Sequence, residues 1–377
     1  MNSRQSFIFN HFKTLITTYD GNLPFHYFFK KYCKFNTALG SKDRWILREI
    51  IYSIYRLGPA WKDKSPEELF LLPNTDDTDE LLKTFYVELE QPENDVAFEY
   101  PFSNFLIKDL QTDEYYKSLQ VQPLVWVRVN QSNTLKFKEK YSSEILAEES
   151  INDKFIAFGL KNNTVIQPDS FPIEVQDLSS QIVSSKIVVK DGMKVWDCCS
   201  GAGGKSLFIS EMYKSAKLFV SDVRPTILEN LKTRFKQNRL PVPKIATSDL
   251  NKKPEKINFS GEIIGRDSFD VIIADVPCSG SGTWGREPEN LTYFKPVTID
   301  EMAVRQINIV KSTLRFLKHG GKLYYITCSV FEKENYGVLK ELEDSGLVKV
   351  VSAEMVYGYD KQADNLFIAE LQAVNRY

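Results

Sequence analysis

The chain has 377 residues, more than one hydrophobic core usually serves, so two or three domains are expected. Hydrophobic residues make up 42% and charged residues 26%, which excludes a largely disordered protein. No stretch approaches the roughly 18 apolar residues of a membrane-spanning helix, and the start MNSRQSFIFNHF lacks the layout of a secretory signal. A cytoplasmic protein without a membrane partner is expected.

The five cysteines are an odd number and form no CxxC pair, so neither a disulfide framework nor a zinc site is expected, and no metal is predicted. The net charge of -2 is far from that of a strongly basic nucleic-acid binder. Any contact with RNA or DNA must therefore use local patches.

Residues 1–120 are expected to form a helical N-terminal region with an uneven charge. Residues 1–65 hold 11 Lys/Arg against 4 Asp/Glu (+7), and residues 66–120 hold 3 against 14 (-11). The run LGSKDRWILREIIYSIYRLG predicts a helix with Ser41 as N-cap and Gly58 past its end. Its basic residues (Lys42, Arg44, Arg48 and Arg56) are interpreted as a solvated face, and an RNA-facing surface stays open. The acidic stretch from Pro66 onwards, with Pro73, Pro92 and Pro101, predicts short helices and loops.

Residues 121–180, which begin with PLVWVRVN, are rich in β-formers and predict a small α/β subdomain. Residues 181–377 alternate between strand and helix patterns, which predicts one doubly wound α/β domain with a mainly parallel sheet. The expected strands are Lys194–Cys199, Leu218–Asp222, Phe269–Asp275, Gly321–Cys328 and Asn365–Leu371, and the expected helices are Lys205–Tyr213, Pro225–Asn238 and Thr298–Leu317.

The segment KVWDCCSGAGGKS places a buried strand before a glycine-rich turn and a helix start, an arrangement typical of a nucleotide-type cradle. It has neither the GxxxxGK[ST] nor the GxGxxG spacing, which favours an adenosyl ligand over a dinucleotide or a triphosphate. Asp222 ends the next strand 25 residues after Asp197 and can accept ribose hydroxyls, and Asp249 can meet an adenine amino group. Together these features indicate S-adenosylmethionine. The alternative is that both aspartates only cap the segments that follow them.

Two cysteines and a carboxylate follow strands of the predicted sheet. Asp275 and Cys278 stand at the end of FDVIIADVPCSGSGT, and Cys328 ends GGKLYYITCS. Open α/β sheets bind their ligands at the carboxyl ends of strands, so these three side chains are expected to converge. Free cysteine is usually a small buried hydrophobe, but this shared location favours reactivity.

These motifs resemble those of the Sun/Fmu family of RNA (cytosine-5)-methyltransferases. Their order along the chain is similar to that of the bacterial ribosomal RNA small subunit methyltransferase B group. The similarity runs through PLVWVRVN, VQDLSSQ, DCCSGAGGKS, DVPCSGSGT, TCSVFEKEN and DNLFIAEL, roughly the last two-thirds of the chain. LGSKDRWILREIIYSIYR resembles, more weakly, the end of that group's NusB-like RNA-binding domain. The chain departs from the family at Ala202, where the glycine turn usually has Pro, and in its short acidic insert.

The resemblance implies a Rossmann-like class I methyltransferase domain with a seven-stranded sheet, and an enzyme that forms 5-methylcytosine in RNA, with ribosomal RNA as the expected target. It implies that Cys328 is the nucleophile and that Cys278 assists release of the methylated base. The chemistry of such a reaction requires a thiolate to attack cytosine C6, and Asp275 is expected to hydrogen-bond the N3 and amino edge of the base. The implied S-adenosylmethionine site comprises Cys199, Ser200, Gly201, Ala202, Gly203, Gly204, Lys205, Asp222, Asp249 and Asp275.

The target base must leave its stack, so single-stranded or loop RNA is the expected partner, with Lys205, Arg286 and Arg128 as candidate phosphate contacts and residues 121–180 as an RNA-binding subdomain. Three alternatives remain: a tRNA cytosine-5 methyltransferase, a DNA cytosine methyltransferase, which would not need Cys328, and a non-catalytic RNA-binding ribosome-assembly factor. A monomer is expected, although the residues leave the oligomeric state open.

Overall fold

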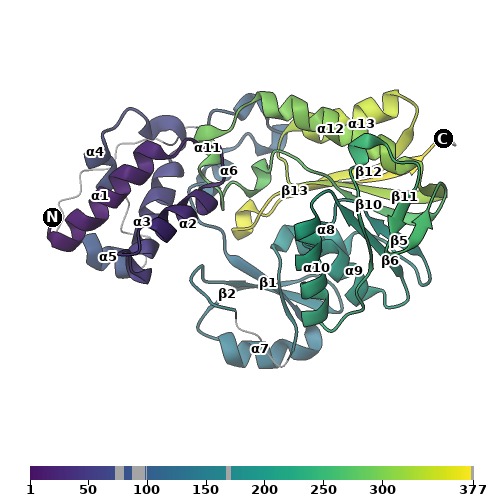
Figure 1. Cartoon of the computed structure of the whole chain (residues 1–377), viewed down its shortest axis with the longest axis horizontal. Helices are drawn as coiled ribbons and strands as arrows, with labels where there is room; N and C mark the ends of the chain where they lie inside the picture. The colour runs from purple at the N-terminus through teal and green to yellow at the C-terminus, as the bar shows by residue number, and fades with distance from the viewer. Residues whose placement is uncertain (73–79, 87–97, 99, 167–170, 375–377) are drawn as a thin grey trace. The chain divides into compact units, whose positions relative to one another are not determined.

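The computed structural model of the chain describes residues 1–72, 80–86, 98, 100–166 and 171–374. Its contacts divide the chain into two compact units (Figure 1). Unit 1 comprises residues 1–104, 111–122 and 284–296, and unit 2 comprises residues 105–110, 123–283 and 297–377. The three-domain division expected from the sequence stays a prediction.

Unit 1 is helical and buries aromatic and aliphatic side chains in one core. Its helices are α1 (Ser3–Thr18), α2 (Phe25–Phe35), α3 (Ser41–Tyr55), α4 (Pro66–Phe70), α5 (Glu80–Tyr86), α6 (Asp113–Ser118) and α11 (Asn290–Tyr293). The prediction of short helices for the acidic stretch is confirmed where it is described, but residues 73–79, 87–97 and 99, with Pro73 and Pro92, lie outside the described residues.

The predicted helix at residues 41–58 is α3, but its cap was assigned wrongly. Gly40 is the N-cap, because Ser41 is already the first residue of the helix. The Gly40 amide donates to the Asp43 carboxylate (3.2 Å). Arg56 is buried, and it was expected to be solvated. Its guanidinium donates to the Gly285 carbonyl (3.4 Å) inside unit 1.

Residues 284–296 lie between two segments of unit 2 in the sequence but belong to the helical unit 1. The Phe25 amide donates to the Glu289 carboxylate (2.8 Å), and the Trp61 indole donates to Thr292 Oγ1 (3.1 Å). Burial raises the pKa of Glu289 to about 7, although the hydrogen bond from Phe25 lowers it. Tyr293 packs edge to face on Tyr19, as expected of a core residue.

Unit 2 contains a seven-stranded sheet in the order β12-β13-β11-β10-β5-β6-β7. All neighbouring strands from β11 to β7 are parallel, and β13 is antiparallel to both of its neighbours. The expected α/β fold with a mainly parallel seven-stranded sheet is thus confirmed. The strands are β5 (Lys194–Asp197), β6 (Lys217–Asp222), β7 (Lys244–Thr247), β10 (Phe269–Asp275), β11 (Leu317–Thr327), β12 (Val348–Val356) and β13 (Leu366–Ala373).

Helices cover both faces of this sheet, because its strands are apolar on both sides. Figure 1 shows α8, α9 and α10 on one face and α12 and α13 on the other. Their bounds are α8 (Leu178–Ser185), α9 (Gly204–Met212), α10 (Pro225–Gln237), α12 (Val297–Leu314) and α13 (Tyr336–Asp344). A two-stranded sheet, β8 (Ile257–Phe259) and β9 (Glu262–Ile264), precedes β10.

Four strands of unit 2 form a second, antiparallel sheet, as the β-rich pattern predicted. Its order is β2-β3-β1-β4, and a separate apolar core lies beneath α7 (Thr134–Tyr141). The strands are β1 (Val125–Asn130), β2 (Ile145–Ser150), β3 (Phe155–Leu160) and β4 (Ile173–Val175). Among the described residues of both units, no helix has the length and apolar character needed to cross a membrane.

Candidate active site

The candidate residues of unit 2 follow the carboxyl ends of five adjacent parallel strands. The glycine turn follows β5, Asp222 ends β6, Asp249 follows β7, Asp275 ends β10 and Cys328 follows β11. These strands are neighbours in the sheet, so their ends meet at one edge, where open α/β sheets bind ligands.

The glycine turn needs glycine at two positions. Gly201 and Gly203 have φ of +52° and +85°, a left-handed conformation that other residues adopt at a cost. At Gly203 a Cβ would also lie 2.8 Å from Leu231 of α10, whereas at Gly201 it would lie 4.0 Å from an Arg224 nitrogen. The turn thus packs on α10 on one side and leaves space on the other.

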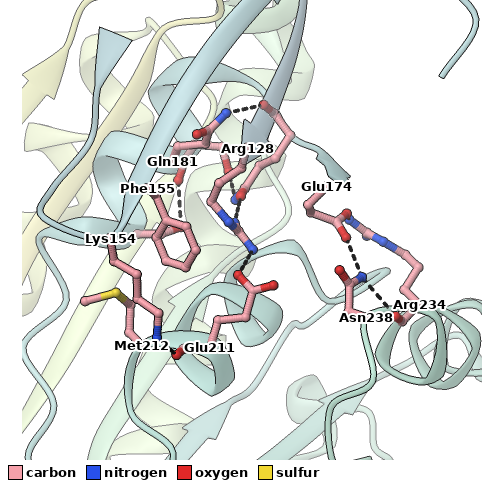
Figure 2. A network of polar contacts seen from close by, with 12 residues as sticks. Arg128, Lys154, Phe155, Glu174, Gln181, Glu211, Met212, Arg234 and Asn238 are labelled. Carbon is pink, nitrogen blue, oxygen red and sulfur yellow. Dashed lines mark hydrogen bonds and ion pairs between the residues drawn. The ribbon is translucent and has the colours of Figure 1, made fainter. Parts of the chain in front are cut away.

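Ala202 stands where the resembling family has Pro, and a hydrogen bond holds the turn there. Arg234 of α10 donates from Nη1 to the Ala202 carbonyl (2.7 Å) and pairs with the buried carboxylate of Glu174. Asn238 also donates to Glu174 (2.9 Å), as Figure 2 shows. The hydrogen bond from Arg234 restrains the backbone at Ala202, where the ring of a proline would restrain φ instead.

Two polar atoms at the turn are suited to a ligand. Asp197 Oδ1 and Ser200 Oγ are buried and have no hydrogen-bond partner in the described part of the chain. The other oxygen of Asp197 accepts from Ser206 Oγ (2.6 Å), and burial raises the pKa of this carboxyl to about 7 despite that bond. An adenosyl ligand with hydroxyl and amino groups fits such atoms. Asp197 and Ser206 were not predicted as site residues, because their burial is not visible in the sequence.

Asp222 is buried and already has partners. It accepts from the Gly201 amide (3.0 Å), from the Arg224 amide (2.9 Å) and from Arg224 Nε (3.0 Å). Burial would raise the pKa of Asp222, but the hydrogen bonds from Arg224 and Gly201 outweigh it and hold the pKa below its ordinary value. The carboxylate is therefore charged, and a ligand hydroxyl would have to replace a hydrogen bond from the exposed Arg224 side chain, which also donates from Nη2 (3.2 Å). Asp249 caps the turn after β7 by accepting from the Asn251 amide (3.1 Å), which is the alternative considered for it.

Lys205 lies in the first turn of α9 and donates to Asp275 Oδ2 (2.6 Å). Burial would lower the pKa of Lys205, but the Asp275 carboxylate raises it above its ordinary value. With only 7% of its surface exposed, Lys205 orients Asp275 and offers little surface to a phosphate. Its expected RNA contact stays a prediction.

The two candidate thiols are neighbours, with 3.2 Å between Cys278 Sγ and Cys328 Sγ. Both are free cysteines and partly exposed. The hydrogen bond with Cys278 raises the pKa of the Cys328 thiol well above its ordinary value, and burial and the carboxylates of Asp275 and Asp364 add to this effect. Cys328 is therefore a protonated thiol at neutral pH in this state. Cys198 is buried, and Cys199 is half-buried in the glycine turn.

Arg128, a candidate RNA contact, lies inside unit 2. Its guanidinium is 2% exposed, lies 5.0 Å from the ring centres of both Phe155 and Phe208, and donates to Glu211 (2.9 Å) and to Gln176. Figure 2 shows this pairing of Arg128 with Glu211. The guanidinium is buried and cannot reach an RNA phosphate in this conformation. An RNA contact of Arg128 therefore stays a prediction that the structure does not favour.

Arg286 is exposed and belongs to unit 1, so the phosphate contact expected of it also stays a prediction. Within the described ranges, no cluster of three or more His, Cys, Asp or Glu side chains is arranged to hold a metal ion.

Comparison with known proteins identifies relatives of this part of the chain. Residues 186–372 match the family model described as 16S rRNA methyltransferase RsmB/F. The ribosomal RNA small subunit methyltransferase B of Xanthomonas campestris pv. campestris is 26% identical over 59% of this chain and 50% of the relative. The probable ribosomal RNA small subunit methyltransferase B of Bacillus subtilis is 26% identical over 67% of this chain and 58% of the relative. The chain thus spans about half the length of these relatives.

Solved structures share the fold. The crystal structure of PH0851 matches with a TM-score of 0.70 and 18% identity and covers 98% of both chains. The structure of NSun6 from Pyrococcus horikoshii with SFG matches with a TM-score of 0.57 and 15% identity, and covers 73% of this chain and 97% of that one. At such identities the likeness concerns the fold alone. Residues 186–372 of this chain, which hold the glycine turn and both neighbouring cysteines, belong to the 16S rRNA methyltransferase RsmB/F family.

Proposed function

We propose that this protein is an S-adenosylmethionine-dependent RNA methyltransferase that forms 5-methylcytosine, with ribosomal RNA as its target. The observation that carries the proposal is the pair of thiols 3.2 Å apart, beside a carboxylate and next to a glycine turn. Its relatives are named as ribosomal RNA methyltransferases, which favours RNA over DNA. A DNA cytosine methyltransferase would need only Cys278.

The cofactor site would use the open side of the glycine turn. Asp222 would accept the ribose hydroxyls, because it is charged and lies beside the Gly201 amide. Asp197 Oδ1 and Ser200 Oγ would gain the partners that they lack. When bound, S-adenosylmethionine supplies the methyl group that an activated ring carbon accepts.

The reaction needs a nucleophile because cytosine C5 is a poor one. The sulfur of Cys328 would attack C6 while the thiol proton passes to N3 of the base, and this addition raises the electron density at C5. Asp275, oriented by Lys205, would hydrogen-bond the N3 and amino edge of the base and favour protonation at N3. After methylation, Cys278 would take the C5 proton, the C6–S bond would break, and Cys328 would leave.

Unit 1 would supply an RNA-binding surface at α2 and α3. A hollow of about 710 Å³ is lined by Tyr27, Phe29, Lys30, Lys31, Cys33, Lys34, Thr37 and Arg44. No acidic residue lines it, and the three lysines are exposed with no acidic partner among the described residues. Aromatic side chains can stack on bases while lysines contact phosphates, so single-stranded RNA is the expected occupant.

The chemistry is tested by incubating the protein with ribosomal RNA and S-adenosylmethionine, followed by bisulfite sequencing. A new 5-methylcytosine that depends on Cys328 supports the proposal. RNA binding without methylation would favour the non-catalytic assembly factor, and modification of transfer RNA alone would favour the tRNA enzyme.

The RNA surface is tested with lysines 30, 31 and 34 changed together to Gln. The control changes three exposed lysines of unit 2, Lys136, Lys214 and Lys236. The slope of log affinity against log salt is expected to fall by about 2 in the first variant, at about 0.7 per lost contact with single-stranded RNA. An equal fall in the control would contradict this surface.

A further inference from the structure

A single buried carboxylate supports the loops of both cysteines. Ser279, the residue after Cys278, donates its amide hydrogen to Glu334 Oε2 (2.9 Å). Ser329, the residue after Cys328, donates its hydroxyl hydrogen to Glu334 Oε1 (2.8 Å). Glu334 is 0% exposed and ends the short turn Glu332–Glu334 that follows β11. One side chain thus fixes a point in each loop, next to each thiol.

The position of Glu334 is itself fixed by the fold. Gln306 of α12 donates to Glu334 Oε2 (2.8 Å) and to the Pro277 carbonyl (3.1 Å). Tyr325 of β11 donates its hydroxyl hydrogen to the backbone carbonyl of Glu334 (2.6 Å). A displacement of the Glu334 carboxylate would leave these buried donors without their hydrogen-bond partner, so its position is restricted.

We propose that Glu334 is a positioning residue that sets the separation of Cys278 Sγ and Cys328 Sγ. The inference rests on the proposed function, in which both sulfurs act on one base, and it adds a residue that touches neither base nor cofactor. Small displacements matter in such a site, since a 1 Å error in a reacting group can cost about 100-fold in rate.

Reach and charge can be separated by two substitutions. Glu334→Asp keeps the charge but shortens the side chain by one carbon, about 1.5 Å, so it cannot hold both serines. Glu334→Gln keeps the reach, because its oxygen can accept from the Ser279 amide and its amide can donate to Ser329 Oγ. The Ser279 hydroxyl, which now donates to Ser329 Oγ, can turn to Ser281 Oγ and free that lone pair. Positioning predicts a defect in the first and near-normal behaviour in the second.

The first measurement needs no RNA. The oxidant diamide takes up two hydrogen atoms as two thiols form a sulfur–sulfur bond, and peptide mapping follows the Cys278–Cys328 link. We expect Glu334→Asp to slow this link at least tenfold and Glu334→Gln to change it less than threefold. Ser329→Ala deletes the hydrogen bond to Glu334 Oε1, together with the contacts of Ser329 Oγ with Ser279 Oγ, Ser281 Oγ and the Phe331 amide. It is expected to slow the link as well and serves if Glu334→Asp does not fold.

A matched control is Asp270→Asn. Asp270 lies near the start of β10, accepts from the Lys194 amide (2.8 Å) and from Lys318 (2.7 Å), and so joins strands as Glu334 joins loops. Its substitution is expected to leave the linking rate unchanged. An equal slowing in Asp270→Asn would assign the effect to general loosening and overturn the proposal.

The second measurement is methylation. In Glu334→Asp the lifetime of the covalent RNA adduct is expected to rise about tenfold, with unchanged affinity for S-adenosylmethionine. Normal linking in Glu334→Asp, or a defect in Glu334→Gln as large as that in Glu334→Asp, overturns positioning. If the linking rates follow the expectation but the unaltered protein methylates no RNA, the proposed function fails while the positioning role stands.

Discussion

Gly282 lies where the loop of Cys278, the segment after β11 and the start of β13 meet. Its amide donates to the Cys328 carbonyl (2.8 Å), and its carbonyl accepts from the Asn365 amide (2.9 Å). A Cβ at this position would lie 2.0 Å from the Asn365 carbonyl oxygen and 3.0 Å from that of Cys328. Both atoms belong to backbone, so no side-chain rotation relieves the contact.

Gly282→Ala is therefore expected to destabilise unit 2 substantially. Overpacking costs about 1–3 kcal/mol, and the two weakened backbone hydrogen bonds add about 1 kcal/mol each. The sum is about 3–5 kcal/mol, or a fall in melting temperature of roughly 10 °C for a domain of this size.

The assay is urea unfolding followed by circular dichroism, with Gly337→Ala as the control. Gly337 lies in the first turn of α13, and the nearest neighbour of its added Cβ would be 3.5 Å away, so alanine is expected to be neutral or stabilising by up to about 1 kcal/mol. Surface substitutions usually change the free energy of unfolding by no more than about 0.5 kcal/mol. A change as small as this in Gly282→Ala would refute the reasoning.

Four further predictions concern the site and its support. Cys278→Ala is expected to accumulate an RNA adduct that survives a denaturing gel, whereas Cys328→Ala forms none; the opposite pattern would reverse the two roles. Because the hydrogen bond from Cys278 raises the pKa of Cys328, adduct formation should quicken as pH rises, and in Cys278→Ala this rise should move to lower pH; an unmoved profile would contradict the cause. Asp222→Asn is expected to weaken S-adenosylmethionine binding about 10- to 100-fold, because a hydrogen bond to a charged group contributes about 1.5–3 kcal/mol. Calorimetry measures this affinity, and an unchanged value would remove Asp222 from the site. Arg128→Met should lower the unfolding free energy by about 3 kcal/mol, since it leaves Glu211 without its partner, while Lys340→Ala, which breaks an exposed pair, should change it by less than about 0.5 kcal/mol.

The sequence by itself predicted the parallel-sheet domain and the residues at its carboxyl edge. The strands β5, β6 and β10 are short apolar runs bounded by glycine, aspartate or proline, so local composition marks both their type and their ends. The polar residues after each strand then fall at one sheet edge whatever the strand order, which is why Asp275, Cys278 and Cys328 could be grouped without coordinates.

Only the tertiary structure decided which of these groups touch. The 3.2 Å between the two sulfurs depends on β10 and β11 being neighbours in register, and the sequence separates Cys278 from Cys328 by 50 residues. Burial was equally invisible: PLVWVRVN shows that Arg128 lies in a strand, but the two phenyl rings and the glutamate that enclose it come from β3 and α9. In the sequence Glu334 is one of two acids in the run FEKEN. The fold buries it between the loops after β10 and β11, where Ser279, Gln306 and Ser329 donate to its carboxylate. A periodic pattern determines where a residue lies along its own element, whereas contacts between elements depend on packing that no single segment encodes.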